Sequence, residues 1–461
     1  MFEADLAIVG SGPAGMAAAG EAARHGMSVL LIDEQARAGG QIYRDIERVA
    51  PLRGNILGPD YLAGLPLLSD LKQDKITHIS GATIWQVEAD GHLTFSRDGN
   101  AQQVKAKSIL LATGALERPM PIPGWTLPGV MTVGAGQILL KESGLIAEDA
   151  VLVGSGPLLY VLASQMVEAG KKPLALVETQ TRSDFLASLV HLGGALRGWP
   201  YLLKGLKLLA TLKKAGVQRF TAARNLSIKG EDAASALHFE TAKGPKTLPC
   251  QTIFLHHGVT PNIQISQSLG LQHAWDDGQF CFTPQLDDWG QSSKETVFIA
   301  GDGAGIGGAK VAELSGRLAA LQLASKLGFL AKPERDRIAY PLKTKKRLEL
   351  AARPFLDRAY PPCEEALEPE DDTIICRCEE VTAGRIRQLA ELGAPGPNQV
   401  KTQSRSGMGP CQGRNCGLSI SMLMSQTTGK SMDETGYFRL RTPLKPVTLG
   451  ELASLHKGTT E

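Results

Sequence analysis

The stretch ADLAIVGSGPAGMAAAGEAARHGMSVLLIDE, residues 4–34, decides the fold. It reads as an apolar strand, a glycine-rich turn, an alanine-rich helix and a second apolar strand, which is a βαβ unit with buried parallel strands. The spacing G-x-G-x-x-G lets the backbone approach a pyrophosphate at the helix amino terminus, and an acid after the second strand suits ribose hydroxyls. The residues predicted to bind a dinucleotide here are Gly10, Gly12, Pro13, Ala14, Gly15, Asp33 and Glu34.

A second copy of this pattern, AVLVGSGPLLYVLASQMVEAGKKPLALVE, covers residues 150–178 and predicts a second nucleotide-type domain. Gly154 and Gly156 keep the first two glycines, and Glu178 ends the following strand. Leu159 replaces the third glycine, and its side chain should push the helix away from the strand. The sequence therefore leaves open whether NAD(H), another adenine nucleotide or no ligand occupies this domain.

Four of the seven cysteines lie in two short segments near the carboxyl end, CRCEEV at 376–381 and GPCQGRNCG at 409–417. Thiolates are soft ligands that suit zinc or an iron–sulfur cluster. Structural zinc usually uses a C-x2-C pair, whereas the first pair here is C-x-C. A cluster is therefore favoured, with zinc as the alternative. The predicted metal ligands are Cys376, Cys378, Cys411 and Cys416.

Composition narrows the class of protein. A chain of 461 residues predicts two or three domains, and a net charge of +2 argues against nucleic-acid binding. No run of 18 apolar residues predicts a membrane span, and the amino-terminal residues read as a strand, so a cytoplasmic protein with free thiols is expected. The apolar stretch 185–212 could dock a partner or touch a membrane, but buried helices are the favoured interpretation.

Three further segments resemble the disulfide-reductase-like flavoproteins: GGQI at 39–42, ILLATGALERP at 109–119 and VFIAGDGAG at 297–305. The resemblance implies bound FAD, with Asp302 towards the ribityl chain. No cysteine precedes Cys250, which excludes the dithiol chemistry of that family. His256 and His257 could be catalytic or structural, and the structural role is favoured. The resemblance adds these FAD contacts: Gly40, Gln41, Ala112, Thr113, Gly114, Gly301 and Asp302.

The chain resembles, over nearly its whole length, the alpha-type subunits of heteromeric amine dehydrogenases and oxidases, such as those of opine oxidase, hydrogen cyanide synthase and D-hydroxyproline dehydrogenase. The resemblance rests on the order of the two nucleotide-type domains, followed by CRCEEVT, MGPCQGRNCG and the tail RLRTPLKPVTLGELA (439–453). The cysteine region is similar to the bacterioferritin-associated ferredoxin-like domain, which holds a 2Fe–2S cluster, although its second pair is C-x2-C and here it is C-x4-C. The resemblance implies FAD and a 2Fe–2S cluster in this chain, and in some members an FMN at a subunit interface.

The same resemblance implies partners. A beta subunit of D-amino-acid-oxidase type, with its own FAD, oxidises the C–N bond of an opine, imino acid or other amino acid. A small ferredoxin-like gamma subunit is often present, and electrons pass towards the respiratory chain or another acceptor. Peripheral membrane attachment would come through the complex. A stand-alone NADH-dependent reductase that feeds a ferredoxin-like acceptor is the alternative.

The expected fold is therefore α/β, with two dinucleotide-binding domains of disulfide-reductase type and a small carboxyl-terminal cluster domain. The predicted divisions are 1–120 and 249–335 for the FAD domain, 121–248 for the second nucleotide domain, 336–372 for a linker, and 373–461 for the cluster domain.

Overall fold

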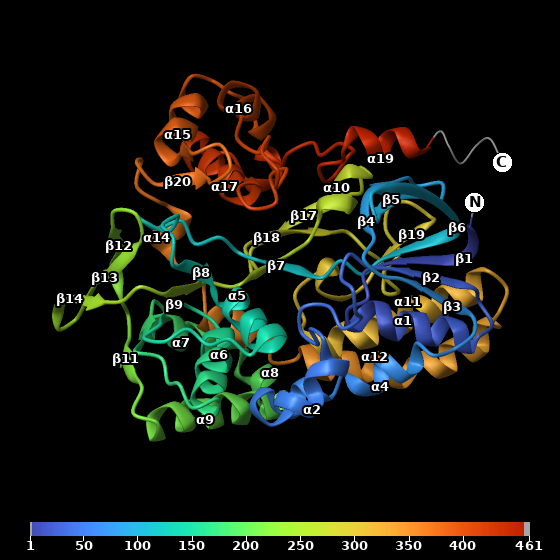
Figure 1. Cartoon of the computed structure of the whole chain (residues 1–461), viewed down its shortest axis with the longest axis horizontal. Helices are drawn as coiled ribbons and strands as arrows, with labels where there is room; N and C mark the ends of the chain where they lie inside the picture. Colours follow the sequence, from blue (N-terminus) through green and yellow to red (C-terminus); the bar gives the residue numbers. More distant parts are fainter. Residues whose placement is uncertain (1, 456–461) are drawn as a thin grey trace.

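The computed structural model describes residues 2–455. They form two α/β domains side by side, called here the first and second layer, with a small helical domain above them (Figure 1). In the first layer, β1, β2, β3, β6 and β19 run parallel, and β4 and β5 form an antiparallel meander on β6. The strand bounds are β1 Phe2–Val9, β2 Val29–Ile32, β3 Ile76–Ile79, β4 Thr83–Val87, β5 His92–Arg97, β6 Asn100–Leu111 and β19 Val297–Ile299.

Two helices cover one face of this sheet, α1 (Pro13–Arg24) and α11 (Ala309–Lys326). They are rich in alanine, and they approach so closely that a Cβ added at Gly316 would lie 2.1 Å from the carbonyl oxygen of Ala14. Small residues allow this approach, which keeps the amino terminus of α1 against the strand ends. Further helices of this part are α2 Ile46–Leu57, α3 Pro59–Leu62 and α4 Leu65–Asp70.

The second layer is a fully parallel sheet in the order β11-β10-β9-β15-β8, with the antiparallel sheet β12-β13-β14 beside it. Its apolar strands are buried because helices such as α6 pack against them. The strand bounds are β8 Val130–Thr132, β9 Val151–Gly154, β10 Ala175–Glu178, β11 Gln218–Phe220, β12 Arg224–Gly230, β13 Ala234–Thr241, β14 Gly244–Pro249 and β15 Ile253–His256. The helix bounds are α5 Val133–Ile138, η1 Leu139–Ser143, α6 Pro157–Glu168, α7 Arg182–Ser188, η2 Leu189–His191, α8 Leu192–Arg197 and α9 Trp199–Lys214.

The second layer corrects one predicted boundary. Strand β15 pairs with β8 and β9, so it completes the second sheet although it follows residue 248. The return to the first domain therefore comes after His256, where β16 (Val259–Pro261) pairs with β7 (Ala115–Glu117) to form a two-stranded crossing between the layers. The prediction failed here because a short apolar strand carries no local signal of which sheet it joins.

Residues beyond the crossing return to the first layer. Helix α10 (Gln264–Ser268), the hairpin β17 (His273–Asp276) and β18 (Cys281–Pro284), and the turn η3 (Gly301–Ala304) flank β19. The segment 336–372 was predicted to be a linker, but it is mostly helical. Helix α12 packs against α11, and α13 packs against α7 and α8, so this segment braces both layers. Its helices are α12 Lys332–Leu350, α13 Arg353–Ala359 and α14 Glu364–Leu367.

The small domain packs four helices and a hairpin around a core that contains Ile386, Ile420 and Phe438. After this core the chain leaves the domain: Leu444 N–H donates to the Trp85 carbonyl (2.8 Å), and α19 (Leu449–Ser454) lies along β6 of the first sheet. No helix of residues 2–455 is long and apolar enough to cross a bilayer. The element bounds are β20 Ile374–Cys376, β21 Val381–Thr382, α15 Ala383–Glu391, α16 Pro397–Ser404, α17 Gly417–Thr428 and α18 Met432–Thr435.

Candidate dinucleotide and cysteine sites

The first glycine turn is built for close backbone approach. A Cβ on Gly15 would lie 1.8 Å from the Gly10 carbonyl oxygen, and Gly10 itself has φ +102°. A Cβ on Gly12 would meet only Gly40, at 3.8 Å, so the turn stays open on its outer side. The Gly39 N–H donates to the Ser11 carbonyl at 2.9 Å, which holds the loop 39–42 against the turn. The amino-terminal N–H groups of α1 therefore face a cradle that suits a pyrophosphate.

The two acids after β2 have different roles. Asp33 is buried and accepts hydrogen bonds from Ser11 N–H (2.5 Å), Ser11 Oγ–H (2.8 Å) and Gln35 N–H (2.7 Å). It therefore fixes the turn as well as standing where a ribose would lie. Glu34 is exposed and pairs with Lys445 of the carboxyl-terminal tail. No pattern in the sequence indicated this pair, because its partners are 411 positions apart along the chain.

The remaining predicted FAD residues lie at the same edge of the sheet. Parallel strands β1, β6 and β19 all end there, which brings 112–114 and 301–302 beside the first turn. A Cβ on Gly303 would contact Thr113 Oγ1 and the Gly114 carbonyl, and Gly301 lies against Ala14. Asp302 Oδ1 accepts from the N–H groups of Gly307 (3.0 Å) and Gly308 (2.8 Å). This arrangement could hold an extended dinucleotide.

A buried lysine that sequence reasoning missed joins the two layers at this edge. Lys141, from η1 of the second layer, donates to the carbonyls of Gln41 (3.1 Å) and Ile42 (2.9 Å) and to Gln137 Oε1 (2.9 Å). Burial lowers the pKa of Lys141 to about 7, while the three acceptors match the three donors of an ammonium group. Lys141 thus fixes the loop that contains Gly40 and Gln41.

The second glycine turn differs from the first in what lies next to it. A Cβ on Gly156 would lie 2.9 Å from His256 Nε2, so an imidazole occupies the space that is open beside Gly12. His256 Nδ1 lies 2.6 Å from Glu117 Oε1, and Glu117 Oε2 accepts from Gly134 N–H at 2.7 Å. Leu159, the third position, is fully buried in the core of the second layer. The predicted conflict at Leu159 is therefore solved by packing, because the core accommodates its side chain.

The acid of the second turn is already neutralised within the chain. Glu178 is fully buried, and Arg219 donates to it through Nε (3.0 Å) and Nη2 (2.9 Å). Tyr160 Oη–H also donates to Glu178, and burial beside this carboxylate raises the pKa of Tyr160. Glu178 is thus not presented to a ribose as the acid of an NADH site would be. Three buried polar atoms nearby have no partner among the described residues: Ser155 Oγ, Thr179 Oγ1 and Gln180 Oε1.

We expect Arg219→Met to destabilise the fold, because it leaves the carboxylate of Glu178 buried without a cation. Removing one partner of a buried ion pair costs about 3–5 kcal/mol, and the partial exposure of Arg219 favours the lower figure. Urea denaturation of the FAD-loaded protein measures the change. Lys171→Met is the control, since its pair with Glu148 is exposed to solvent and should contribute little to stability. Equal effects of the two variants would contradict this account.

His257 has a structural position. It is buried, its Nε2 lies 2.6 Å from the Pro119 carbonyl, and its Nδ1 accepts from the Cys363 N–H at 3.2 Å. Burial lowers the pKa of His257 well below its usual value, so the ring is neutral near pH 7. Both ring nitrogens are used by the protein, which favours packing over proton transfer.

The four predicted cysteine ligands come together in the small domain. The hairpin β20–β21 carries Cys376 and Cys378, and the loop before α17 carries Cys411 and Cys416. A Cβ on Gly409 would lie 2.3 Å from Cys378 Cβ, so only glycine allows the two loops to meet there.

Each thiol has another as its neighbour, in the order Cys376, Cys416, Cys411, Cys378. Hydrogen bonding from Cys416 lowers the pKa of Cys376 to about 6 and the pKa of Cys411 to about 5. These thiol contacts and burial raise the pKa of Cys416, and desolvation raises that of Cys378. Two of the four sulfurs thus favour the thiolate, which is the metal-binding form.

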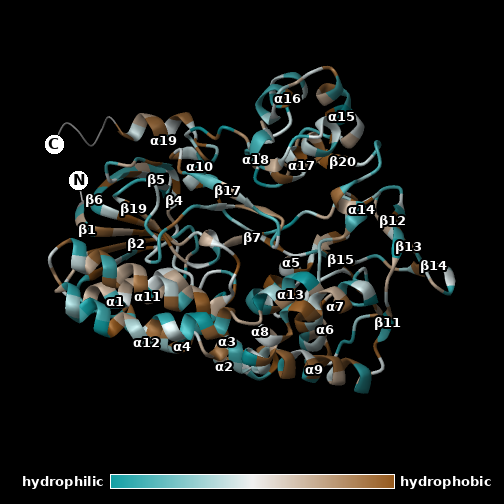
Figure 2. Cartoon of the chain, turned by 180° about the vertical axis from the view of Figure 1, so that it is seen from behind, coloured by the Kyte–Doolittle hydropathy of each residue, from teal (hydrophilic) through white to brown (hydrophobic). Residues whose placement is uncertain are grey.

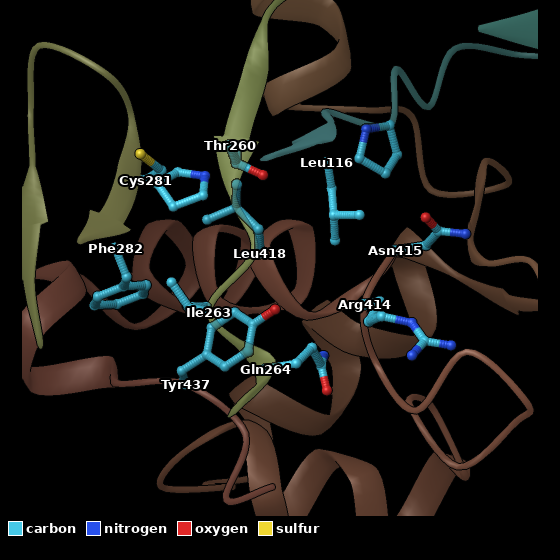
Figure 3. A pocket seen from close by; sticks show the side chains of 12 residues that line it. Leu116, Thr260, Ile263, Gln264, Cys281, Phe282, Arg414, Asn415, Leu418 and Tyr437 are labelled. Atoms are coloured by element: carbon cyan, nitrogen blue, oxygen red, sulfur yellow. The ribbon is translucent and has the colours of Figure 1, made fainter. Parts of the chain in front are cut away.

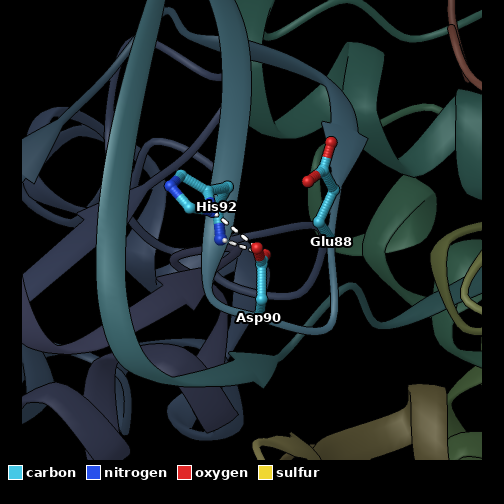
Figure 4. A group of neighbouring side chains, drawn as sticks. All are labelled: Glu88, Asp90 and His92. Carbon is cyan, nitrogen blue, oxygen red and sulfur yellow. Dashed lines mark hydrogen bonds and ion pairs between the residues drawn. The ribbon is translucent and has the colours of Figure 1, made fainter.

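The spread of the sulfurs bears on the choice of metal. A tetrahedral zinc site has Zn–S distances of about 2.3 Å, which places its sulfurs about 3.8 Å apart. Within residues 2–455, the group of potential ligands whose donor atoms all lie within 4.8 Å of one another is Glu88, Asp90 and His92, and not the cysteines (Figure 4). Within these residues, no three of the four cysteine sulfurs meet that spacing, so they do not form a compact tetrahedral set. The group in Figure 4 lies on a surface hairpin and is solvated.

The cysteine domain is seated on the crossing between the two layers. Trp125 Nε1–H donates to the Ile374 carbonyl at 2.7 Å, and Trp275 N–H donates to Asp433 at 2.9 Å. A narrow recess lies between the crossing and the cysteine domain (Figure 3). Leu116 and Thr260 from the crossing form one wall, and residues next to the cysteines form the other: Arg414, Asn415, Leu418 and Tyr437.

The fold and its first site define a flavoprotein oxidoreductase with two dinucleotide-type domains. Residues 4–326 match the pyridine nucleotide-disulphide oxidoreductase family, and residues 371–456 match the sarcosine oxidase A3 domain. The chain therefore belongs to the pyridine nucleotide-disulphide oxidoreductase family, in the group that carries a sarcosine oxidase A3 domain and includes the A-type subunits of opine oxidases.

Individual relatives cover nearly the whole chain. The A-type subunit of the opine oxidase from Rhizobium meliloti is 42% identical over 98% of this chain and 87% of its own length. Hydrogen cyanide synthase subunit HcnB of Pseudomonas protegens is 33% identical over 95% of each chain. The crystal structure of L-proline dehydrogenase from P. horikoshii superposes with a TM-score of 0.71, at 19% identity, over 98% of this chain and 79% of that one. The last comparison speaks to the fold alone.

Proposed function

We propose that this chain is the electron-transfer subunit of a heteromeric oxidase or dehydrogenase that acts on the C–N bond of an opine, imino acid or other amino acid. One observation carries the proposal most directly. The cysteine domain is hydrogen-bonded to Trp125 of the second layer and to Trp275 in the β17–β18 hairpin of the first, so redox groups held at the cysteines and at the first turn would lie in one framework. The relatives named above are subunits of oxidases or synthases, which supports the same role.

The first site is proposed to hold FAD, in keeping with the family. The turn 10–15 and the α1 amino terminus would bind the pyrophosphate through N–H groups. Asp33 and Glu34 stand at the ribose position, and Asp302 would face the ribityl chain. Lys141 would keep the loop with Gly40 and Gln41 in place by filling its carbonyl acceptors. Ala112, Thr113, Gly114 and Gly301 would form the wall opposite the turn.

The cysteine site is proposed to hold a 2Fe–2S cluster on Cys376, Cys378, Cys411 and Cys416. When bound, a flavin exchanges electrons in pairs or singly and a cluster exchanges them singly, so together they supply a relay. The protein would contribute by favouring the thiolate form of two of the thiols. Gly407 and Gly413 have no side chains, so the ring of Phe438 can pack directly against the loop that carries the second cysteine pair.

Substrate oxidation itself is assigned to a partner subunit. Among the described residues, neither nucleotide-type site pairs a perturbed acid or base with an open substrate recess. His256 and His257, at the end of β15, are engaged with Glu117 and the Pro119 carbonyl. The proposed partner is a D-amino-acid-oxidase-like flavoprotein, with an FMN at a subunit interface and a small ferredoxin-like subunit as further members of the complex. A cytoplasmic complex that passes electrons to a respiratory or other acceptor completes the proposal.

The rival function is a stand-alone reductase that takes electrons from NADH. The second site counts against it, because His256 fills the space beside Gly156 and Glu178 is held by Arg219. The unpartnered polar atoms of Ser155 and Thr179 leave hydrogen-bonding capacity for another adenine nucleotide bound without the acid. We therefore assign electron entry to the partner subunit and not to nicotinamide.

An anaerobic titration of the purified, cofactor-loaded chain with NADH tests this assignment. We expect no bleaching of the flavin or cluster absorbance at NADH in large excess, and full bleaching with dithionite. The His256→Ala and Arg219→Met variants, titrated in parallel, show whether clearing the second site creates NADH reduction. Prompt bleaching of the unmodified protein would overturn the relay and establish the reductase.

A further inference from the structure

The apolar stretch 185–212 does not form the buried helices that its composition favoured. Helix α9 lies at the lower edge of the second layer in Figure 1, and many large apolar side chains of the segment 185–206 are exposed to solvent. Of the 21 large apolar side chains that are exposed in the described residues, nine fall within 22 residues. This group, the outer apolar face, comprises Phe185, Leu186, Leu189, Val190, Leu192, Leu196, Trp199, Leu203 and Leu206.

Helix α9 separates two apolar faces. Its inner face buries Leu212 and packs Leu208 and Leu209 against the core of the second layer, in contact with α6. On the outside, Trp199, Leu203 and Leu206 recur at spacings of four and three, so they share one face of the helix. In Figure 2 much of the α9 ribbon has the colour of apolar residues. The inner face explains the fold, whereas Trp199, Leu203 and Leu206 on the outer face remain largely exposed to solvent.

The segment that carries the outer apolar face is basic in sequence, although Lys204 already pairs with Asp60 of α3. Residues 182–214 contain six basic residues and one acid, Asp184, which already caps α7 through Thr181. The segment therefore has a net charge of +5 in a chain whose total is +2. Among its lysines, Lys207 and Lys214 are exposed on α9 close to the apolar stripe. The basic residues are Arg182, Arg197, Lys204, Lys207, Lys213 and Lys214.

The combination of apolar and basic side chains on this face indicates what kind of surface it binds. The centres of protein–protein interfaces are depleted in lysine, so lysines amid the apolar side chains argue against a subunit contact. Helices that lie in a bilayer interface combine Trp, Phe and Leu with flanking Lys and Arg, which attract anionic headgroups. The face also lies at the other end of the second layer from the cysteine domain, so its use would leave the cysteine domain free (Figure 1).

We propose that helices α7–α9 bind the surface of an anionic lipid bilayer. The apolar side chains would enter the headgroup–acyl boundary, and Lys207, Lys214 and their neighbours would contact lipid phosphates. The second layer would then serve as the attachment end of the subunit. This attachment belongs to the chain itself and needs neither a spanning helix nor a partner.

Vesicle flotation of the purified full-length, cofactor-loaded chain tests the proposal. The probes are vesicles of phosphatidylcholine alone and of phosphatidylcholine with phosphatidylglycerol in equal parts. We expect binding to the anionic vesicles only, with binding reduced by salt. Lys207→Glu with Lys214→Glu should lower the partition coefficient by at least about 30-fold, since each basic residue near the surface contributes about fivefold. Trp199→Glu with Leu206→Glu should abolish binding.

Leu392→Glu is the matched control, because Leu392 is equally exposed but lies on the small domain. Each variant must keep its flavin absorbance and unfolding midpoint, which separates surface loss from misfolding. Absence of binding to anionic vesicles overturns the proposal, as does binding that the α9 variants do not weaken. If the unmodified chain ignores vesicles but loses a co-purifying subunit on Trp199→Glu with Leu206→Glu, the face is a protein interface instead.

Discussion

Gly15→Ala is expected to strip FAD from the protein. The added methyl would lie 1.8 Å from the carbonyl oxygen of Gly10, which is backbone and cannot rotate away. To relieve the clash, the first turn of α1 must move by roughly 1 Å or more, and α1 is held on its other side by Gly316 of α11. The N–H groups that would face the pyrophosphate move with it. Strain of about 1–3 kcal/mol corresponds to a loss of about 5- to 150-fold in FAD affinity.

The measurement is the FAD content per chain after purification, followed by FAD titration of the apoprotein. Gly205→Ala is the control, because Gly205 also lies in a helix and a Cβ there meets nothing within 4 Å. That change should leave FAD content unaltered and stabilise α9 slightly. A Gly15→Ala protein that retains one FAD per chain with unchanged affinity would mean that the turn does not bind the pyrophosphate.

Cys416→Ser is expected to remove the proposed cluster and to leave the flavin. Cys416 is buried at the start of α17 and is in hydrogen-bond contact with both Cys376 and Cys411, so it is central to the row of sulfurs. A serine hydroxyl is a poor ligand for iron, and the other three thiols cannot complete the set. Iron and acid-labile sulfide, each about two per chain in the unmodified protein, should fall to near zero.

Cys281→Ser is the matched control, since Cys281 is equally buried but lies in a hairpin outside the row of sulfurs. It should keep the iron content, the sulfide content and the cluster spectrum. One zinc per chain and no iron in anaerobically purified protein would contradict the cluster proposal and favour a structural metal. Full iron content in Cys416→Ser would remove this residue from the ligand set.

Much of the first site could be predicted because its information is local. The glycines at 10, 12 and 15 are needed by neighbouring backbone, and the acids follow at the end of the next strand, so one βαβ unit contains them all. The four cysteines were also found from their spacing. Their pairing order was not, because it depends on how the loop 405–416 folds against the β20–β21 hairpin.

The second glycine turn could not be interpreted from its own sequence, because residues from other strands lie beside it. Leu159 departs from the motif, yet the core accommodates it. The features that block the site come from elsewhere: His256 from the last strand of the sheet and Arg219 from the edge strand. Neither residue lies in a motif, and only strand order brings them beside Gly156 and Glu178. Lys141 likewise reaches the flavin-side loop, whose carbonyls lie about 100 positions away along the chain.

By itself, the sequence determined the α/β class, the two glycine turns, the cysteine set and the family, because each depends on residue types at short, fixed spacings. The tertiary structure alone decided the extent of the second domain, the pairing of Glu178 with Arg219, and the exposure of apolar side chains on α7–α9. The physical reason is that burial is a property of the assembled chain: an apolar run reads the same whether or not a second layer remains to cover its outer face.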